Sequence, residues 1–265
     1  MTKILTDKTR PGVPKRDDVF YPESDGLPMG ETGIHVDCIL ELLGCLRTLF
    51  FPRGRTDVHC AADMFLYYEE GNPKANKSPD VMVTFGIDGT DLRRTFKTWV
   101  EGTAPHVIFE ITSDSTWKID VYEKPLLYAS LGVEEYYIFD PLDERLKPRF
   151  QGFELVDGGY RPMPIEPDGS IVSPRLAARM TPEGSRIRLF PVESSESVPM
   201  STEFQPRLEE LQFKYTQADA ERSRAIERAR EAAERAEEAA ERAKVLEAEV
   251  ARLRSLLEKQ TDPDA

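Results

Sequence analysis

Apolar positions along the chain recur with two different periods, and each period predicts a different kind of element. From Thr32 to Phe51 apolar residues return every three or four positions, which predicts a helix. Thr32 is a suitable N-terminal cap, and the Pro52 to Gly54 stretch predicts where this helix ends. Shorter runs rich in apolar and aromatic residues predict strands at residues 57–62, 64–68, 81–85, 107–111 and 133–139.

A second helical stretch lies between the last two of these strands, at residues 117–131. Gly132 follows it at the position where glycine commonly ends a helix. Pro125 lies inside the stretch, so we expect a kink or a tightened turn there. Strand, helix and strand in this order predict a crossover unit packed on a sheet. The fold class expected is therefore α/β, with a mixed central sheet and flanking helices.

The last third of the chain changes from short strands to one long helix. Residues 153–156 and 187–190 are strand candidates, and Asp157-Gly158-Gly159 predicts a hairpin turn. We expect four parts: a disordered or extended lead-in at 1–28, a folded α/β domain at 29–192, a linker at 193–202 and a coiled-coil helix at 203–260.

The helix at 203–260 carries an unbroken heptad pattern. Steps of seven from Leu208 reach Leu257, and steps of seven from Leu211 reach Leu253, with alanine at most of the central positions. Flanking Glu and Arg complete the pattern, which is typical of coiled coils. The chain is therefore expected to form a homo-oligomer through this helix; a solitary surface helix is the alternative.

Charge and composition restrict the choice of partner and compartment. The 265-residue chain has a formal net charge of −13, which argues against binding nucleic acid through overall electrostatics. A local basic patch or a bound metal would be needed instead. Cys38, Cys45 and Cys60 have no zinc-ligand spacing and are expected to be buried and reduced. Neither a signal-peptide pattern nor a run of about 20 apolar residues is present, so we expect no membrane association and a cytoplasmic protein.

Two carboxylates lie against apolar runs that predict buried strands. Asp80 is at the mouth of the strand at 81–85, and Glu110 is inside the strand at 107–111. Burying a carboxylate is costly without a partner or a metal, and Mg²⁺ (or Mn²⁺) prefers one or two carboxylates together with waters. Asp80 and Glu110 are therefore candidate metal ligands. The alternative for Glu110 is a pair with a buried Arg or Lys.

Asp120, Lys124 and Tyr128 repeat every four residues and therefore lie along one helical face. A lysine beside two metal-binding acids could position the attacking water and stabilise developing charge during phosphodiester hydrolysis. A solvated Asp-to-Lys pair explains the same spacing equally well. A basic and aromatic cluster at residues 93–99 is either a solvated loop or a loop that contacts phosphate.

Several of these motifs together resemble the Uma2 family of restriction-endonuclease-like proteins, in the PD-(D/E)xK nuclease superfamily. The resemblance covers roughly residues 20–190 and leaves out the C-terminal helix. The matching motifs are E-T-G-I-H (31–35), D-M-F-L-Y-Y-E-E-G-N-P (63–73), P-D-V-M-V (79–83), F-E-I-T-S-D-S-T (109–116), Asp120, Lys124, Tyr128 and L-G-V-E-E-Y-Y-I-F-D-P (131–141).

The resemblance implies a restriction-endonuclease-like core and divalent-metal-dependent cleavage of DNA. It assigns Asp80 and Glu110 as the two acids, with Glu31 as a possible supporting residue. The chain departs from the superfamily pattern at Thr112, where the motif lysine would stand, and the resemblance implies that Lys124 supplies that charge. Asp114 stands where relatives often have proline and adds a negative charge near the site.

The leading hypothesis is a metal-dependent DNA endonuclease with Asp80 and Glu110 holding Mg²⁺ and Lys124 near the attacking water. Asp120 and Tyr128 would support Lys124. The alternative is a catalytically inactive nuclease-fold scaffold that acts as an interaction module through its coiled coil. A hydrolase acting on another phosphate ester is a third possibility.

Overall fold

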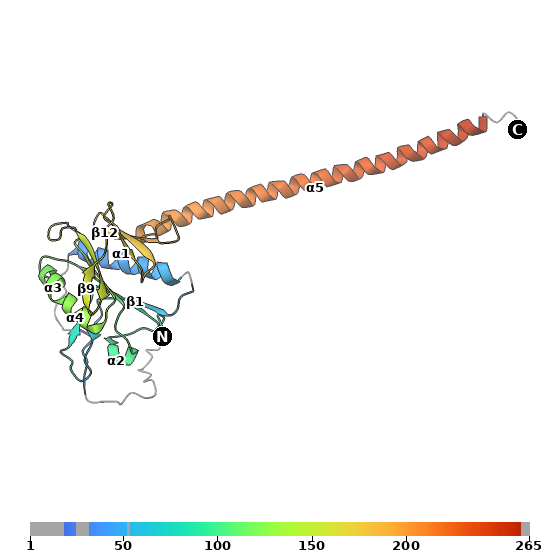
Figure 1. The fold of residues 1–265 in the computed structure, drawn as a ribbon. Helices are drawn as coiled ribbons and strands as arrows, with labels where there is room; N and C mark the ends of the chain where they lie inside the picture. The colour runs from blue at the N-terminus through green and yellow to red at the C-terminus, as the bar shows by residue number, and fades with distance from the viewer. Residues whose placement is uncertain (1–18, 25–31, 52–53, 261–265) are drawn as a thin grey trace. The chain divides into compact units, whose positions relative to one another are not determined.

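The computed structural model describes residues 19–24, 32–51 and 54–260, with side chains described to residue 254. Glu31 and most of the predicted lead-in at 1–28 therefore lie outside the described residues. Contacts between Cα atoms divide the chain into two compact units, Met1–Ser201 and Thr202–Ala265. The first unit holds the α/β fold, and the second holds nearly all of one long helix (Figure 1).

A six-stranded mixed sheet forms the centre of the first unit, in the order β1-β4-β6-β7-β8-β9. Only β6 and β7 pair in parallel within it; the other neighbours are antiparallel. The strands are β1 (Val58–Ala62), β4 (Val81–Phe85), β6 (Val107–Ile111), β7 (Glu135–Phe139), β8 (Phe150–Val156) and β9 (Gly159–Pro162). The mixed α/β architecture with a long C-terminal helix is the fold class that the sequence predicts.

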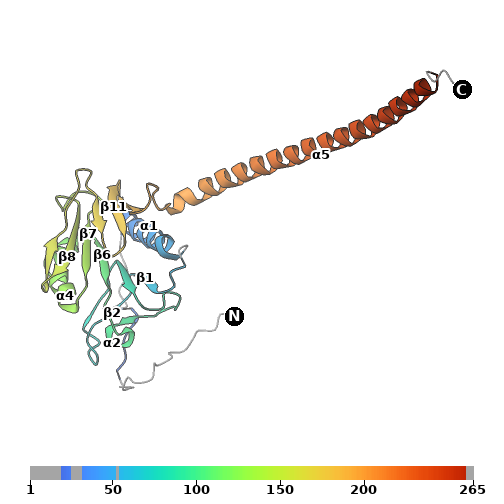
Figure 2. The ribbon, with the colours of Figure 1, turned by 45° about the vertical axis from the view of Figure 1, so that its right-hand side comes forward.

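Alternate residues of the central strands feed two separate hydrophobic cores. Phe109 and Tyr137 point into the first core, which is shared with α1 (Gly33–Phe50). A three-stranded sheet closes that side, formed by β10 (Ile171–Ser173), β11 (Ala178–Glu183) and β12 (Arg186–Pro191). Figure 2 shows β6, β7 and β8 side by side, with α1 and β11 to one side of them and α4 to the other.

The second core lies under the crossover between β6 and β7. Ile108 and Tyr136 point into it, together with Tyr128 from the crossover. The predicted helix at 117–131 is two helices, α3 (Trp117–Tyr122) and α4 (Lys124–Leu131), and Pro125 lies in the first turn of α4. The break predicted from Pro125 is thus confirmed, because proline fits the first turn of a helix but not its interior.

Smaller elements and termini pack more closely than their polar sequences predict. A second three-stranded sheet has the order β3-β2-β5, formed by β2 (Leu66–Tyr67), β3 (Asn76–Lys77) and β5 (Phe96–Lys97), and α2 (Thr98–Glu101) follows β5. Within the predicted lead-in, Tyr21 accepts a hydrogen bond from the Gly71 amide at 2.6 Å. Within the predicted linker, Val198 and Met200 are buried in the first core.

The 60-residue helix α5 (Ser201–Gln260) begins where the first unit ends. The buried carboxylate of Glu41, on α1, accepts hydrogen bonds from the amide of Ser201 at 2.9 Å and from its hydroxyl. A carboxylate at this place accepts a hydrogen bond from an amide that has no partner inside the helix, and its negative charge interacts favourably with the positive end of the helix dipole. No helix among the described residues is both long and apolar enough to cross a membrane.

Candidate functional site

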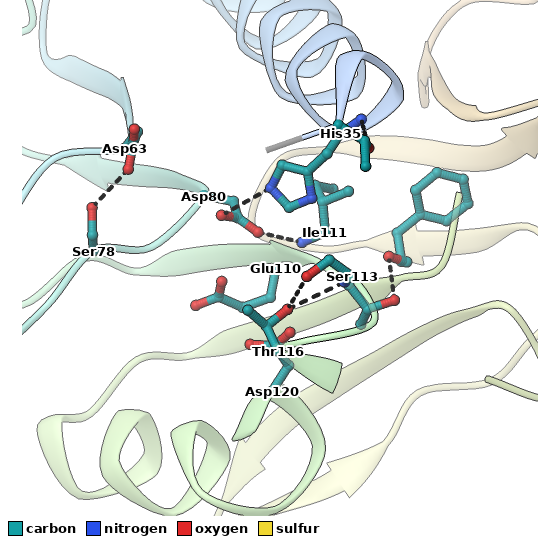
Figure 3. Close-up of polar contacts among 12 residues, drawn as sticks. His35, Asp63, Ser78, Asp80, Glu110, Ile111, Ser113, Thr116 and Asp120 are labelled. Atoms are coloured by element: carbon teal, nitrogen blue, oxygen red, sulfur yellow. Dashed lines mark hydrogen bonds and ion pairs between the residues drawn. The ribbon is translucent and has the colours of Figure 1, made fainter. Parts of the chain in front are cut away.

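Asp80 and Glu110 come from the neighbouring strands β4 and β6. The antiparallel register pairs Val81 with Phe109, so Asp80, one residue before Val81, stands opposite Glu110, one residue after Phe109. The Asp80 carboxylate accepts a hydrogen bond from the Ile111 amide at 2.6 Å, which ties it to β6 directly. Figure 3 shows the two acidic side chains beside one another at this end of the strands.

Glu110 is fully buried, and two residues of α4 hold its carboxylate. The Lys124 ammonium donates to Oε2 at 2.7 Å, and the Tyr128 hydroxyl donates to Oε1 at 2.8 Å. Burial raises the pKa of Glu110 to about 8; the Lys124 charge opposes this rise, while the Asp80 and Asp120 charges add to it.

Lys124 lies between two acids and is mostly buried, with 13% of its side chain exposed. Its ammonium is 2.7 Å from Glu110 and 2.8 Å from Oδ1 of Asp120, one helical turn earlier. Burial alone would lower the pKa of Lys124, but Glu110, Asp120 and Asp80 outweigh burial and raise it. The interpretation of the Asp-to-Lys spacing as a solvated pair is therefore wrong, because both side chains are largely buried.

Asp120 and Tyr128 each contact one partner of the Lys124–Glu110 ion pair: Asp120 contacts the ammonium of Lys124, and Tyr128 contacts the carboxylate of Glu110. Asp120 is 1% exposed, and its pKa is raised by burial, with Lys124 acting in the opposite direction. Tyr128 contacts Glu110 rather than Lys124, and burial raises its pKa well above the usual value. Three carboxylates, those of Asp80, Glu110 and Asp120, thus act electrostatically on one ammonium.

His35 is a further residue at this site. It lies in the first turn of α1, is 4% exposed, and places its Nε2 atom 3.6 Å from Oδ1 of Asp80 (Figure 3). The sequence alone does not reveal this contact, because the helical phase of His35 does not say what α1 packs against. Glu31, the supporting residue that the resemblance suggested, lies outside the described residues.

Asp63 and Ser78 lie beside Asp80 at the mouth of the site and were not selected from the sequence. The Asp63 amide contacts the carbonyl oxygens of Pro79 and Asp80, at 3.2 Å each, and its carboxylate accepts from the Ser78 hydroxyl at 3.1 Å. Asp63 has a φ of 48°, a left-handed conformation that is uncommon for residues other than glycine. The sequence does not predict this conformation, although aspartate is among the residues that tolerate it.

Two other sequence expectations are resolved by the geometry. Thr112, at the position of the motif lysine, is buried, and its hydroxyl donates to the Phe139 carbonyl at 3.4 Å. Asp114 does not bring an unbalanced charge to the site, because its exposed carboxylate pairs with Arg145 at 2.6 Å.

In the basic and aromatic cluster at 93–99, each basic side chain contacts another residue of the fold. Arg93 is held by Glu101 at 2.8 Å and by the Asp88 carbonyl at 2.7 Å. Arg94 pairs with Glu23 at 2.5 Å, and the Lys97 ammonium lies 4.7 Å from the centre of the Tyr21 ring. These contacts fix the segment to the fold.

The described residues contain no group of three or more His, Cys, Asp or Glu side chains arranged to hold a metal by themselves. A divalent cation nevertheless fits the site, because the three carboxylates, once all are ionised, exceed the single ammonium by two negative charges. Mg²⁺ and Mn²⁺ are suited to Asp and Glu oxygens and complete their coordination with water.

An α/β fold with paired acids on adjacent strands and a lysine from the crossover helix is the arrangement that the family resemblance implies. Residues 24–182 match the Uma2 family, described as "Putative restriction endonuclease", and the chain belongs to this family. A crystal structure of a "putative nuclease belonging to DUF820" from Anabaena variabilis ATCC 29413 is similar over 57% of this chain and 76% of that chain. The TM-score is 0.42 and the sequence identity 17%. Comparison with curated proteins gave no match.

Proposed function

We propose that this protein is a divalent-metal-dependent endonuclease that hydrolyses DNA phosphodiester bonds. Asp80 and Glu110 would hold Mg²⁺ or Mn²⁺, and Lys124 would lie near the attacking water. The observation that carries the proposal is the buried Glu110 carboxylate, which faces Asp80 across two strands and is held by Lys124 at 2.7 Å. Membership of a family described as restriction endonucleases supports the same chemistry.

The electrostatics of the site favour a cation. A buried carboxylate with a pKa of about 8 is mostly protonated at neutral pH, so the charged form is not satisfied by Lys124 alone. A nearby divalent cation would lower that pKa and restore the charged form. Asp80, partly exposed and fixed by the Ile111 amide, would be the more accessible ligand.

The bound metal would supply Lewis acidity and a water of lowered pKa. The chain's own contribution is to hold an ammonium where negative charge develops on the phosphate, which is the electrostatic part of catalysis. Asp120 restrains the Lys124 ammonium, and Tyr128 restrains the far oxygen of Glu110. Because both partners come from the crossover helices, the site does not need a lysine at position 112.

The partners follow from this proposal. The substrate is DNA, although the net charge of −13 means that a metal must offset the local repulsion of phosphate. We further propose that the chain self-associates through α5, on which every described side chain from Phe204 to Arg254 is exposed and an apolar heptad seam runs along one face.

The test is cleavage of supercoiled plasmid DNA with Mg²⁺ or Mn²⁺ and with EDTA. The parent chain should cleave only with metal, and Asp80→Asn, Glu110→Gln and Lys124→Met should each lose most of this activity. Glu154→Gln, an exposed glutamate on β8, is the matched control and should be unaffected. Calorimetric titration with Mn²⁺ gives a second readout, in which Asp80→Asn and Glu110→Gln should bind more weakly.

Unchanged cleavage in both acid variants would refute the metal-ligand roles. A parent chain that neither cleaves DNA nor binds Mn²⁺ would refute the enzyme and leave the inactive scaffold. Metal binding together with hydrolysis of a different phosphate ester would support the proposed metal site but refute DNA as the substrate.

A further inference from the structure

The second unit of the chain is a helix that carries an exposed apolar seam. The α5 seam comprises the positions of the two heptad series, and its bulky side chains lie at the two ends while alanines fill the middle. Leu208 is 50% exposed, Leu246 63% and Leu253 54%. Exposed leucines at both ends of a heptad seam, joined by small alanines, are what a partner helix buries.

We propose that α5 pairs with α5 of a second copy of this chain in parallel and in register. This goes beyond self-association, because it specifies the direction and the alignment of the two helices. It does not depend on the nuclease chemistry. The argument rests on the charged residues that flank the seam.

In a parallel two-stranded coiled coil, the residue just before a position of the Leu208 series faces, in the partner helix, the residue five places later, which lies just after a position of the Leu211 series. In register, this rule brings Lys214 against the second copy's Asp219. It likewise brings Arg242 against Glu247, and Glu249 against Arg254. By symmetry each pair occurs twice.

The other flanking positions do not oppose this arrangement. Arg207, Glu221, Arg228 and Arg235 face Gln212, Ile226, Ala233 and Ala240 of the second copy, so none of them meets a like charge. All of the charged pairs formed between flanking positions in the parallel register are therefore of opposite sign. Along its own helix Lys214 also pairs with Glu210 at 2.6 Å, and Arg242 pairs with Glu238 at 3.7 Å.

Arg222 is the one charged residue on the α5 seam. In the parallel register the two copies of Arg222 face one another, and each guanidinium lies next to Glu221 of the other copy, which offers it an opposite charge at the edge of the seam. A single polar residue at such a position fixes register at a cost in stability, because a slip of one heptad would place Arg222 beside Lys214 or Arg228 of the second copy instead of Glu221.

An antiparallel pair is less well matched. When the two helices overlap fully in that direction, Leu208 faces Leu253, and the apolar ends still meet. The flanking charges are then mixed: Lys214 approaches Arg242 and Asp219 approaches Glu247, whereas Arg207 approaches Glu249 and Glu221 approaches Arg235. Like charges across a helix interface are unfavourable, and between flanking positions only the antiparallel direction forms them, so charge favours the parallel direction.

The parallel direction has a consequence for the whole protein. Each copy of α5 begins at the end of a first unit, so two parallel helices bring both first units to the same end of the coiled coil. A particle would then present two copies of the candidate site together. In the antiparallel direction the two copies would be separated by the length of α5.

Disulfide cross-linking of the full chain tests the direction. Leu211→Cys and Leu253→Cys should each form a covalent dimer by itself under mild oxidation, because equivalent seam positions meet in a parallel register. Ala220→Cys, on the opposite face of α5, is the matched control and should stay monomeric on non-reducing gels. The native cysteines Cys38, Cys45 and Cys60 are buried and leave the parent chain uncross-linked.

Antiparallel helices would give the reverse result: neither Leu211→Cys nor Leu253→Cys alone would cross-link, but a mixture of Leu211→Cys and Val250→Cys would. That pattern would overturn the proposal. So would a parent chain that sediments as a monomer at high concentration, since no pairing of any direction would then exist.

A charge exchange tests the register. Arg242→Glu should weaken the dimer about tenfold, because it faces Glu247 of the second copy twice. The double variant Arg242→Glu/Glu247→Arg should restore the parent dissociation constant, apart from the loss of the Arg242 to Glu238 ion pair along the same helix, which both variants share. A double variant as weak as the single one would overturn the in-register alignment.

Discussion

Replacing Glu110 by glutamine should stabilise the protein at neutral pH and change how its stability depends on pH. The glutamine keeps an oxygen for the Tyr128 hydroxyl and removes the charge that burial disfavours. Lys124 keeps Asp120 at 2.8 Å as its partner. The same substitution should abolish metal-dependent cleavage, so stability and activity would move in opposite directions.

The magnitude follows from the two pKa values of Glu110. Its pKa rises from 4.5, the ordinary value, to about 8 in the folded protein. A raised folded pKa means that the folded state holds a proton that the unfolded chain has lost. The contribution to stability is therefore fully present below pH 4.5 and is lost as the pH rises toward 8. Between pH 5 and pH 7.5 the loss is about 3 kcal/mol, which glutamine at this position would not show.

The assay is urea unfolding of both proteins at pH 5, 6, 7 and 7.5, in buffers that contain EDTA. Both tryptophans, Trp99 and Trp117, lie in the first unit, so their fluorescence reports on the fold that contains Glu110. The free-energy difference between Glu110→Gln and the parent should grow in favour of the variant with each pH unit. Adding Mn²⁺ should reduce this slope, because a bound cation favours the charged carboxylate.

The control is Glu154→Gln, which removes a charge from an exposed glutamate of the same sheet. Its stability should follow the parent at every pH. If the Glu110→Gln and parent curves also ran parallel from pH 5 to 7.5, the claim that burial raises the Glu110 pKa in this fold would be wrong.

Two further predictions use the same unfolding assay. Tyr128→Phe should lower the free energy of unfolding by about 1–3 kcal/mol, because it removes a donor from a buried carboxylate; an unchanged value would mean that Glu110 does not depend on this hydroxyl. Gly89→Ala should destabilise by more than about 1 kcal/mol, because a Cβ there would collide with the Val58 carbonyl oxygen. Gly44→Ala, inside α1 with open space around it, should instead stabilise by about 0.5–1 kcal/mol. Equal effects at the two glycines would count against the close approach at Gly89.

Patterns that are local in sequence predicted much of the fold. The strands β4 and β6 were predictable because each is a buried apolar run within five consecutive residues. The break at Pro125 was predictable because the proline ring and its missing amide hydrogen act within one helical turn. The hairpin at Asp157 and Gly158 is similar, since both residues adopt positive φ, as the tight turn requires.

The site could be predicted only in part, because its contacts are long-range. The spacing of Asp120, Lys124 and Tyr128 fixes their common face but not what that face covers. Only the packing of the crossover on β6 shows that it covers Glu110. The contact of His35 with Asp80 likewise depends on where α1 crosses the sheet. The cluster around Arg93 was expected to be either a solvated loop or a loop that contacts phosphate, because nothing in the local sequence signals that Glu101 pairs with Arg93.

The parallel junction between β6 and β7 makes the site unusually sensitive to insertions. A lysine carried by the same strand as Glu110 would keep its place through any change in the crossover. Lys124 instead reaches Glu110 from a helix, where each added or deleted residue turns the side chain by about 100° around the helix axis. An insertion between Asp120 and Lys124 would therefore separate the ammonium from both acids, even with every strand intact. Changes of length should be tolerated at the β8–β9 hairpin, whereas within residues 120–128 they should break the contacts of Lys124 with Glu110 and Asp120.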